Sequence, residues 1–310
     1  MTKNKIIINE NNAGIRLDIF LFKLFPNLSH SQIWSFIRKR KVRINGKRVI
    51  DNNYRLQLDD IITYYFFGTR IKPKHEKTSI SLSQQQVFYE DDDLLLVYKD
   101  YGIIMHSHHN SLNNMVNQYL QNKGISIKDY AFSVHHVHRI DRETKGLVIY
   151  AKTRKAQQYL YKQFQERRVI KGYYAVIANT NKYAFTKWTN LEGYILYNKG
   201  YFVKLNSVPT SDAKYAKIKI RKIKALQNKF CLLQIQCLTG RKHQIRILLS
   251  KNETPIINDH KYGLGKKDNL LLFSYLLKFN KEKTINLKQY YFEITMERIL
   301  GEINEIMNWK

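Results

Sequence analysis

Residues 138–151 contain an aspartate flanked by arginines and are the stretch best suited to a chemical role. Asp141 lies between Arg139 and Arg142, and a small polar turn separates it from the apolar run 147–151. Such a run predicts a buried strand, which would present the carboxylate at a rigid edge. Two interpretations are open at this point: an ionised group with a chemical role, or a surface salt-bridge cluster at a turn.

Two other clusters contain residue types that bind metal ions. An acidic run occupies positions 90–93, and histidines gather at 106–109 and 135–138. Neither histidine group has a Cys or His pair at the usual spacing of a zinc site, and four successive acids point in different directions. We therefore expect a hairpin turn at 90–93 and no metal. A metal-dependent nuclease is a third hypothesis, which would require activity that chelators abolish.

The charge balance of the whole chain indicates a polyanionic partner. The 310 residues include 53 Lys and Arg against 25 Asp and Glu, a net charge of +28, and 44% are hydrophobic. The length accommodates one large and one small domain, and the charge favours nucleic acid or an anionic membrane. No apolar run is long enough for a transmembrane helix, and the start lacks a signal peptide's apolar segment. We expect nucleic acid as the partner and no membrane association.

Cys231 and Cys237 lie in one expected strand, which separates them by roughly 20 Å. That distance is too long for a disulfide bond between them. They are expected to be core thiols in a reducing cytoplasm.

The first 70 residues predict two helices that lead into a β-hairpin. Apolar residues at helical spacing indicate helices over 15–25 and from position 30 to about 40. Ser29 and Gln32 have the spacing of a capping box at the start of the second helix. Asn45-Gly46 between two alternating runs is typical of a hairpin turn.

A basic surface is expected where the second helix ends and the hairpin begins. Residues 38–48 contain seven basic side chains and no acid. Phosphate binding needs such side chains on one surface, although a solvated charge run is the simpler alternative. The expected RNA-binding residues of this surface are Arg38, Lys39, Arg40, Lys41, Arg43, Lys47 and Arg48.

Residues 14–66 resemble the alpha-L RNA-binding domain, the small module named for ribosomal protein S-four. The resemblance rests on Arg16-Leu17-Asp18, Leu28 to Ile33, Ile37-Arg38, Val42 to Arg48 and Leu58 to Ile62. Asp59 is a departure, because a turn glycine is commoner at that position.

The remainder of the chain predicts several strands and one clear helix. Strands are expected at about 87–90, 94–99 and 171–177, and a helix over 157–168. Within 214–238, apolar and basic residues alternate and a second apolar run follows, which predicts a hairpin with one basic face.

Three stretches together resemble the RluA-type pseudouridine synthases. They are Arg139-Ile140-Asp141-Arg142, Lys171-Gly172-Tyr173 and Gly240 to Arg246. The first is similar to the family's H-R-L-D-[KR]-[DE]-T-[ST]-G-L motif, and the third to its G-R-T-H-Q-[IL]-R-V-H-L element. Further matching positions are Glu90 to Val97, Lys99, Gly102, Ala175, Ile177, Pro255-Ile256 and Asp259 to Gly263.

The chain departs from that family's pattern at five places. Lys145 replaces Ser or Thr, Lys242 replaces Thr, and Leu248 replaces His. Asn258 replaces Gly, and Asp100-Tyr101 stand where Pro and a small residue are usual. Because the acid, tyrosine and arginine of the pattern remain, these departures bear on RNA specificity and loop geometry rather than on the chemistry.

The resemblance implies isomerisation of uridine to pseudouridine, without cofactor or metal. The bond from ribose to nitrogen 1 of uracil breaks, and the base rejoins through carbon 5. Asp141 would be the catalytic carboxylate, held ionised by Arg246; whether it attacks the anomeric carbon or removes a proton stays open. Tyr173 would stack on the flipped base, and its hydroxyl is a candidate to take the carbon 5 proton. Arg139 is expected to contact RNA, and Leu249 to form part of the base pocket.

The whole chain is therefore predicted to be a cytoplasmic, monomeric α+β protein. An RNA-binding domain would span residues 1–70, a linker 71–86, and a pseudouridine synthase domain with a mixed, largely antiparallel sheet 87–310. The resemblance is greatest to the branch acting on large-subunit (23S) ribosomal RNA, which is the expected partner. The alternative is a non-catalytic RNA-binding ribosome-assembly factor on the same fold, which would bind RNA without forming pseudouridine.

Overall fold

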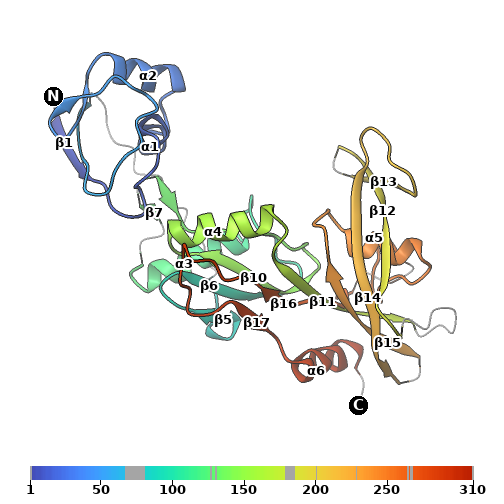
Figure 1. Ribbon diagram of the computed structural model, residues 1–310. Coiled ribbons are helices and arrows are strands. Elements are labelled where there is room, and N and C mark those ends of the chain that lie inside the picture. The colour runs from blue at the N-terminus through green and yellow to red at the C-terminus, as the bar shows by residue number, and fades with distance from the viewer. Residues whose placement is uncertain are drawn as a thin grey trace.

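Two separate sheets organise the chain in the computed structural model. It describes residues 2–66, 81–125, 128–129, 131–178, 186–199, 201–227, 229–263, 265 and 268–308. A 4-stranded sheet forms in the N-terminal part and an 11-stranded sheet in the remainder, with a 2-stranded hairpin besides. Figure 1 shows the N-terminal sheet and its helices, in blue, as a body of their own beside the large sheet.

The N-terminal module packs two short helices and its sheet, of order β1-β4-β2-β3, around one core. Its elements are β1 (Thr2–Ile7), α1 (Leu17–Leu24), α2 (His30–Arg38), β2 (Val42–Ile44), β3 (Lys47–Arg48) and β4 (Ile61–Phe66). The predicted capping box is present, because the Ser29 hydroxyl accepts from Gln32 N–H and the Gln32 side chain accepts from Ser29 N–H. Asn45 and Gly46 adopt positive φ angles of 51° and 77°, as the predicted hairpin turn requires.

The large sheet has the order β13-β12-β14-β15-β11-β16-β10-β6-β5, with β17 beside β16 and β9 beside β10. Its named strand pairs are antiparallel except β10 with β16, so the predicted α+β class with a mixed, largely antiparallel sheet is confirmed. The strands are β5 (Val87–Glu90), β6 (Leu94–Lys99), β9 (His135–His136), β10 (Lys145–Ala151), β11 (Ile170–Ala178), β12 (Thr189–Asn198), β13 (Tyr201–Asn206), β14 (Lys214–Leu226), β15 (Phe230–Cys237), β16 (Leu272–Lys278) and β17 (Tyr291–Glu293). The separate hairpin joins β7 (Lys128–Asp129) and β8 (Phe132–Ser133).

Helices cover both faces of the large sheet where the central strands lie. They are α3 (Leu112–Asn122), α4 (Arg154–Gln165), α5 (Gln244–Lys251) and α6 (Met296–Met307). Val148 of β10 packs in the core that contains α3, whereas its neighbour Ile149 packs in the core that contains α4. A strand buried on both faces has no polar alternation, which accounts for the continuous apolar run after the Asp141 loop.

An asparagine-rich segment joins the module to the large sheet's layer of helices. Asn12 Oδ1 accepts from Ala131 N at 3.0 Å, and Asn11 Oδ1 accepts from Arg154 N, at the start of α4, also at 3.0 Å. Lys23 Nζ donates to Ala131 O at 2.7 Å. Ala131 itself packs into the core of the module. The module is therefore anchored by contacts outside the connecting segment.

Most of the expected linker, 71–86, lies outside the described residues, although Gln84–Gln86 form the short 3-10 helix η1. The expected domain boundaries stay predictions. Cys231 and Cys237 are buried free thiols of β15. Within the described ranges, no helix has the length and apolar character needed to cross a membrane.

Candidate active site

Asp141 lies in a tight loop that leads into β10. Thr144 N–H donates to Asp141 O at 3.1 Å and closes the turn. Before the loop, His138 Nε2 accepts from Ile149 N at 3.2 Å, and its ring stacks on Phe164 with 4.9 Å between centroids. Burial lowers the pKa of His138 to about 3, so the ring is neutral and able to accept. These contacts fix both ends of the loop to the strand that follows it.

Gly146 allows the strand to begin at once after the loop. Its φ is +128°, and a Cβ atom there would lie 2.2 Å from Ser274 O of β16. Both the backbone angle and this close approach exclude a side chain. Because β10 pairs with β16 at this point, the glycine sets the position of the loop relative to the middle of the sheet.

A buried lysine holds the loop from the side of β6. Lys99 is fully buried, and its Nζ donates to the carbonyl oxygens of Asp100, Ile103 and Arg142 at 2.8, 3.1 and 3.0 Å. Burial lowers the pKa of Lys99 to about 7. Arg142 and Gly102 also exchange hydrogen bonds, Gly102 N to Arg142 O and Arg142 Nε to Gly102 O, both at 3.1 Å. Arg142 therefore fastens the loop and does not pair with Asp141.

The first turn of α5 forms the facing wall of the site. The buried Gln244 shapes it: Oε1 accepts from Thr239 Oγ1 at 2.7 Å and Arg241 N at 2.8 Å, and Nε2 donates to Thr239 O at 3.0 Å. His243, at the N-cap of α5, has the left-handed angles φ 54° and ψ 19°. This backbone brings both His243 and Arg246 to the same cavity as Asp141.

The direct partner of Arg246 differs from the expected one. Its Nε and NH2 atoms donate to the two oxygens of Asp259 at 2.8 and 2.7 Å, and both side chains are almost fully buried. Although burial acts to raise it, the hydrogen bonds and charge of Arg246 hold the pKa of Asp259 below its ordinary value. Arg246 therefore makes its bidentate ion pair with Asp259 and influences Asp141 through its charge.

One cavity of about 640 Å³ brings the expected catalytic side chains together. Asp141, Tyr173, Arg246 and Arg139 all line it, although they come from separate parts of the chain. The volume is in the range of small-ligand pockets and suits one nucleotide. Its described lining contains one carboxylate, that of Asp141, among several cations; the cations are Arg139, Arg167, Lys171, Arg241, Lys242 and Arg246.

The Asp141 carboxylate is partly withdrawn from water, with 23% of its side chain exposed. Burial raises its pKa above the ordinary value, while the charges of Arg246, Arg139 and Lys99 act in the opposite direction. Burial prevails, so the arginines moderate the increase rather than reverse it. A carboxylate of raised pKa is a better base and nucleophile than an exposed aspartate.

Tyr173 of β11 also lines the cavity, and burial raises the pKa of its hydroxyl far above the ordinary value. Its phenol is therefore protonated near neutral pH and acts as a hydrogen-bond donor. The stacking role and the role of proton acceptor that the resemblance implies for Tyr173 both stay predictions. Next to it, Lys171 Nζ donates to Thr239 O at 3.0 Å and ties β11 to the turn before α5.

Leu249 does not occupy the expected place. It is fully buried in the large core and is not part of the cavity lining. Ile245, one helical turn earlier, and Leu272 are the apolar residues that reach the cavity from α5 and β16. The expectation was wrong because the sequence does not reveal which turn of α5 faces the cavity.

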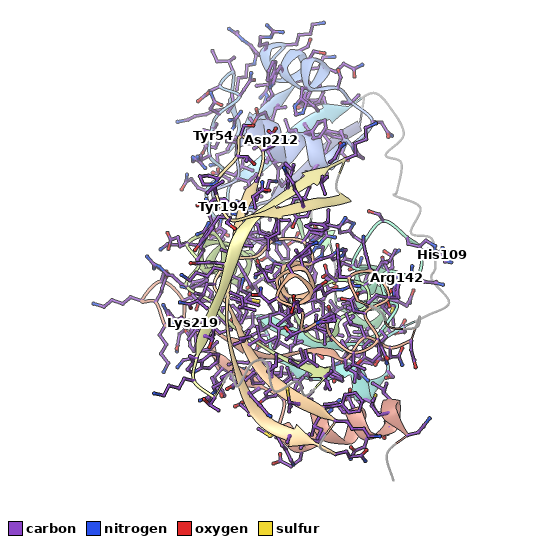
Figure 2. The ribbon with its side chains drawn as sticks, turned by 90° about the vertical axis from the view of Figure 1, so that its right-hand side faces the viewer. Tyr54, His109, Arg142, Tyr194, Asp212 and Lys219 are labelled. Carbon is purple, nitrogen blue, oxygen red and sulfur yellow. The ribbon has the colours of Figure 1, made fainter. Side chains whose placement is uncertain are left out.

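The expected RNA-binding residues of the module lie mostly at its surface. Arg38, Lys39, Arg40, Lys47 and Arg48 are exposed, and Lys41 and Arg43 are half-buried. The basic face of β14 is a different surface: Lys219, which Figure 2 labels on that strand, is not part of the cavity lining.

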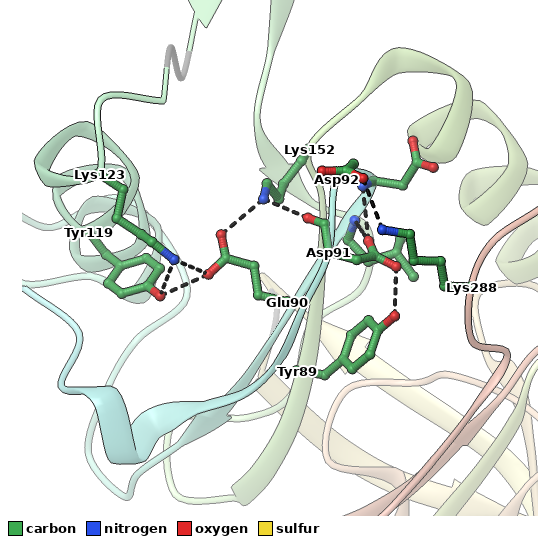
Figure 3. Close-up of polar contacts among 10 residues, drawn as sticks. Tyr89, Glu90, Asp91, Asp92, Tyr119, Lys123, Lys152 and Lys288 are labelled. Carbon is green, nitrogen blue, oxygen red and sulfur yellow. Dashed lines mark hydrogen bonds and ion pairs between the residues drawn. The ribbon is translucent and has the colours of Figure 1, made fainter.

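The acidic run 90–93 forms the predicted hairpin turn between β5 and β6. Figure 3 shows that Glu90 accepts hydrogen bonds from Lys123, Lys152 and Tyr119. Burial acts to raise the pKa of Glu90, but these partners lower it to about 2. Its charge is thus used in structural ion pairs. Across the described part of the chain, no three His, Cys, Asp or Glu residues form a group that could hold a metal ion.

Comparison with known proteins agrees with this fold. Residues 93–251 match the family model of RNA pseudouridylate synthase, and residues 15–62 match that of the S4 domain. The chain is 33% identical over 290 residues to an uncharacterized RNA pseudouridine synthase of Mycoplasma capricolum, covering 90% of this chain and 91% of that protein. It is 32% identical over 275 residues to the ribosomal large subunit pseudouridine synthase C of Buchnera aphidicola, covering 84% and 81%.

A solved structure supports the fold. Human RNA Pseudouridylate Synthase Domain Containing 4 aligns with a TM-score of 0.56 at 19% identity, over 72% of this chain and 93% of that one. Fold and comparisons together define an enzyme class, the RNA-modifying isomerases that make pseudouridine. The chain belongs to the RluA family of RNA pseudouridine synthases, with an S4 domain before its catalytic part.

Several residues of the site were not selected from the sequence. Lys99, His243, Asp259 and Tyr262 all lie within stretches that match the family's pattern, but no spacing or periodicity identifies their roles. The His243 Nδ1 atom lies 2.7 Å from the Tyr262 hydroxyl, and Nε2 lies 3.8 Å from Asp141 Oδ1. These contacts join segments far apart in sequence, and only the folded chain shows them.

Proposed function

We propose that the protein isomerises specific uridines in large-subunit (23S) ribosomal RNA, with Asp141 as its catalytic carboxylate. The observation that carries this proposal is the shared cavity, in which Asp141 lies opposite α5 among cationic side chains. The cations would bind the phosphates beside a flipped nucleotide, and Asp141 would act at its ribose.

The other side chains of the cavity have complementary roles in this proposal. Tyr173 would stack on the flipped uracil and donate a hydrogen bond. Arg139, exposed at the mouth of the cavity, would contact the RNA and offset part of the flipping cost, a few kcal/mol. Arg246, held by Asp259, would supply a fixed positive charge that favours the ionised form of Asp141.

The substrate class is proposed from the domain arrangement, the charge and the names of the relatives. The S4 domain binds RNA, and the exposed basic residues 38–48 would form its phosphate-binding surface. Relatives such as the Buchnera protein are named for the ribosomal large subunit. We place the reaction in the cytoplasm and propose a monomer, because module and cavity within one chain suffice for binding and chemistry.

The catalytic role of Asp141 can be tested by tritium release from RNA labelled at carbon 5 of uracil. Wild type should release tritium, and Asp141→Asn, which keeps the size of the side chain, should release none while still binding RNA. Asp141→Ala gives an independent second variant. Full activity in either variant would sink the assignment of Asp141.

The substrate can be tested separately by mapping pseudouridines in ribosomal RNA from cells with and without the gene. Loss of particular pseudouridines from large-subunit RNA supports the proposal. Loss of pseudouridines from another RNA class contradicts the proposed substrate. An assembly factor without catalysis would bind RNA tightly and in a salt-sensitive manner, yet leave the map unchanged.

A further inference from the structure

A histidine and a tyrosine form a chain of contacts that ends at Asp141. The two ring nitrogens of His243 face different partners: Nδ1 lies 2.7 Å from the Tyr262 hydroxyl, and Nε2 lies 3.8 Å from Asp141 Oδ1. Tyr262 continues the chain, because its ring lies under the guanidinium of Arg246 at 5.1 Å. The contacts therefore run from the Arg246–Asp259 ion pair through Tyr262 and His243 to the carboxylate.

The surroundings determine the protonation state of the imidazole. Burial and the neighbouring cations lower the pKa of His243 to about 3, so the ring is neutral near neutral pH. A neutral imidazole has one N–H donor and one acceptor nitrogen. If the lone pair of Nε2 faced Asp141, it would repel the carboxylate. The favoured tautomer therefore has its hydrogen on Nε2, and Nδ1 accepts from Tyr262.

Tyr262 is suited to hold that tautomer. Burial raises the pKa of its hydroxyl to about 12, so the hydroxyl remains a donor throughout the neutral range. Its position is fixed in turn, because Tyr262 N–H donates to Asp259 Oδ1 at 3.0 Å. Hydrogen bonding at one nitrogen of a histidine determines which form the other nitrogen presents.

The backbone at His243 is itself arranged for this orientation. The residue adopts φ 54° at the N-cap of α5, and its side chain makes no capping hydrogen bond. A left-handed conformation is unfavourable for a residue with a Cβ, and such strain is concentrated at functional sites. A capping serine or aspartate would suit the helix better, so helix formation alone does not account for histidine here.

We propose that His243 is a positioning residue for the reaction: its Nε2–H, held by the Tyr262 hydroxyl, orients the Asp141 carboxylate and favours its ionised form. This inference rests on the proposed catalytic role of Asp141. The present 3.8 Å is longer than a hydrogen bond, and such contacts tighten when substrate closes an active site. With one oxygen held by His243, the other is directed toward the ribose.

Other charged and titratable groups also face Asp141 and act on its proton affinity. The cations are Arg246, Lys242 and Lys261 around α5, Arg139 in the loop, and Lys99 from β6. The neutral groups are Tyr173 of β11, Tyr197 of β12, Cys237 of β15 and Tyr262. The His243→Asn substitution changes none of these side chains chemically, so a shift in the titration of Asp141 reports the loss of the imidazole and of its contact with the Tyr262 hydroxyl.

The test compares three variants by single-turnover pseudouridine formation at saturating RNA, across pH values from about 5 to about 9. His243→Asn removes the ring but keeps a residue that tolerates the left-handed backbone. Tyr262→Phe removes only the hydroxyl and keeps the ring above which Arg246 lies. His260→Asn is the matched control, because His260 is exposed and does not line the cavity.

Loss of the Nε2–H donor should raise the pKa of Asp141 further, so the acid limb of the rate profile should move to higher pH. The rate below this limb should fall by about tenfold or more in His243→Asn, and by less in Tyr262→Phe, with RNA affinity unchanged. The His260→Asn profile should superimpose on that of wild type.

Uniform loss of rate at every pH, or an unshifted limb in both variants, overturns the inference. Reduced RNA affinity equal to the rate loss overturns it as well. If His243→Asn does not fold, Tyr262→Phe alone decides the question. Failure of the proposed function itself is distinguishable, because wild type would then form no pseudouridine, or Asp141→Asn would retain activity.

Discussion

Lys145 Nζ lies 3.2 Å from Asp100 Oδ1, so two residues that depart from the family's sequence pattern are paired with each other. The same ammonium lies 3.0 Å from Glu302 Oε2 of α6, and it packs over the rings of Tyr98 and Tyr101. The Tyr98 hydroxyl donates to Glu302 as well, at 2.8 Å. Lys145 stands where the family has Ser or Thr, and Asp100 and Tyr101, which also depart from the family's pattern, contact its ammonium group.

This pairing connects the C-terminal helix to the catalytic loop. Lys145 follows directly after Thr144, whose N–H closes the turn at Asp141. Asp100 belongs to the segment that Lys99 and Gly102 fasten to the same loop. We therefore interpret Lys145 as a support of the loop on the side away from the cavity, since it is not among the residues that line it.

Lys145→Ala should destabilise the fold by about 1–3 kcal/mol, because partly buried Glu302 loses its nearer cation and keeps only Arg298, at 3.7 Å. In double-mutant cycles, the coupling of Lys145 with Glu302 should exceed its coupling with Asp100, which is 46% exposed against 15% for Glu302. Urea unfolding measures the loss of stability and the two coupling free energies. Lys288→Ala is the control, because its partner Asp92 is fully solvated, and its urea midpoint should not change. Equal midpoints for Lys145→Ala and the control would contradict this account.

Substitutions at the Arg246–Asp259 pair can distinguish its contribution to stability from its contribution to catalysis. Asp259→Ala should cost about 3–5 kcal/mol of unfolding free energy, since it leaves a buried guanidinium unpaired. The double variant Arg246→Met, Asp259→Leu should recover part of that loss, because it removes the unpaired charge but also the acceptor of the Lys261 and Tyr262 N–H groups. It should nevertheless remain inactive in tritium release, since the positive charge acting on Asp141 is absent. An active double variant would remove Arg246 from the chemistry.

Local signals in the sequence were reliable where neighbours along the chain determine the structure. The capping box of Ser29 and Gln32, the Asn45-Gly46 turn and the alternation in β14 all appear where they were predicted. Two departures from family patterns also have a local cause. Asp59 and Asn258 stand where glycine is commoner and adopt positive φ angles of 64° and 65°, which Asp and Asn tolerate better than most residues.

Contacts between distant segments were not predictable in the same way. Arg246 was assigned to Asp141 because both belong to the family's pattern, but Asp259 provides a bidentate partner that no periodicity indicates. Leu249 was placed in the pocket because the helical phase of α5 was unknown, and it lies in the core. The partner of Lys145 is Glu302 in the last helix, a relationship only the fold creates.

Asp141→Asn should abolish activity and, near neutral pH, stabilise the protein. Burial raises the folded-state pKa of Asp141 above its unfolded value. Its contribution to stability is therefore complete below the unfolded pKa and is lost as pH rises through the folded pKa. Above that value the wild-type carboxylate is ionised at a cost that neutral asparagine avoids. Thermal unfolding should show a higher midpoint for Asp141→Asn at neutral pH, with the difference shrinking toward acid pH; a lower midpoint at neutral pH would show that the carboxylate is favourably held.

The basic surface of the S4 domain is best tested by substitution rather than by removing residues 1–70. Ala131 packs into the module's core, so deleting the module would expose apolar surface on the catalytic part. Lys47→Ser with Arg48→Ser changes two exposed residues of β3 and leaves the core intact. If each side chain contacts a phosphate, the slope of log affinity against log salt should fall by about 0.7–0.9 per residue. Lys283→Ser removes one exposed charge from the catalytic part and should leave the slope unchanged. A slope for the double variant equal to that of this control would show that the surface is a solvated charge run.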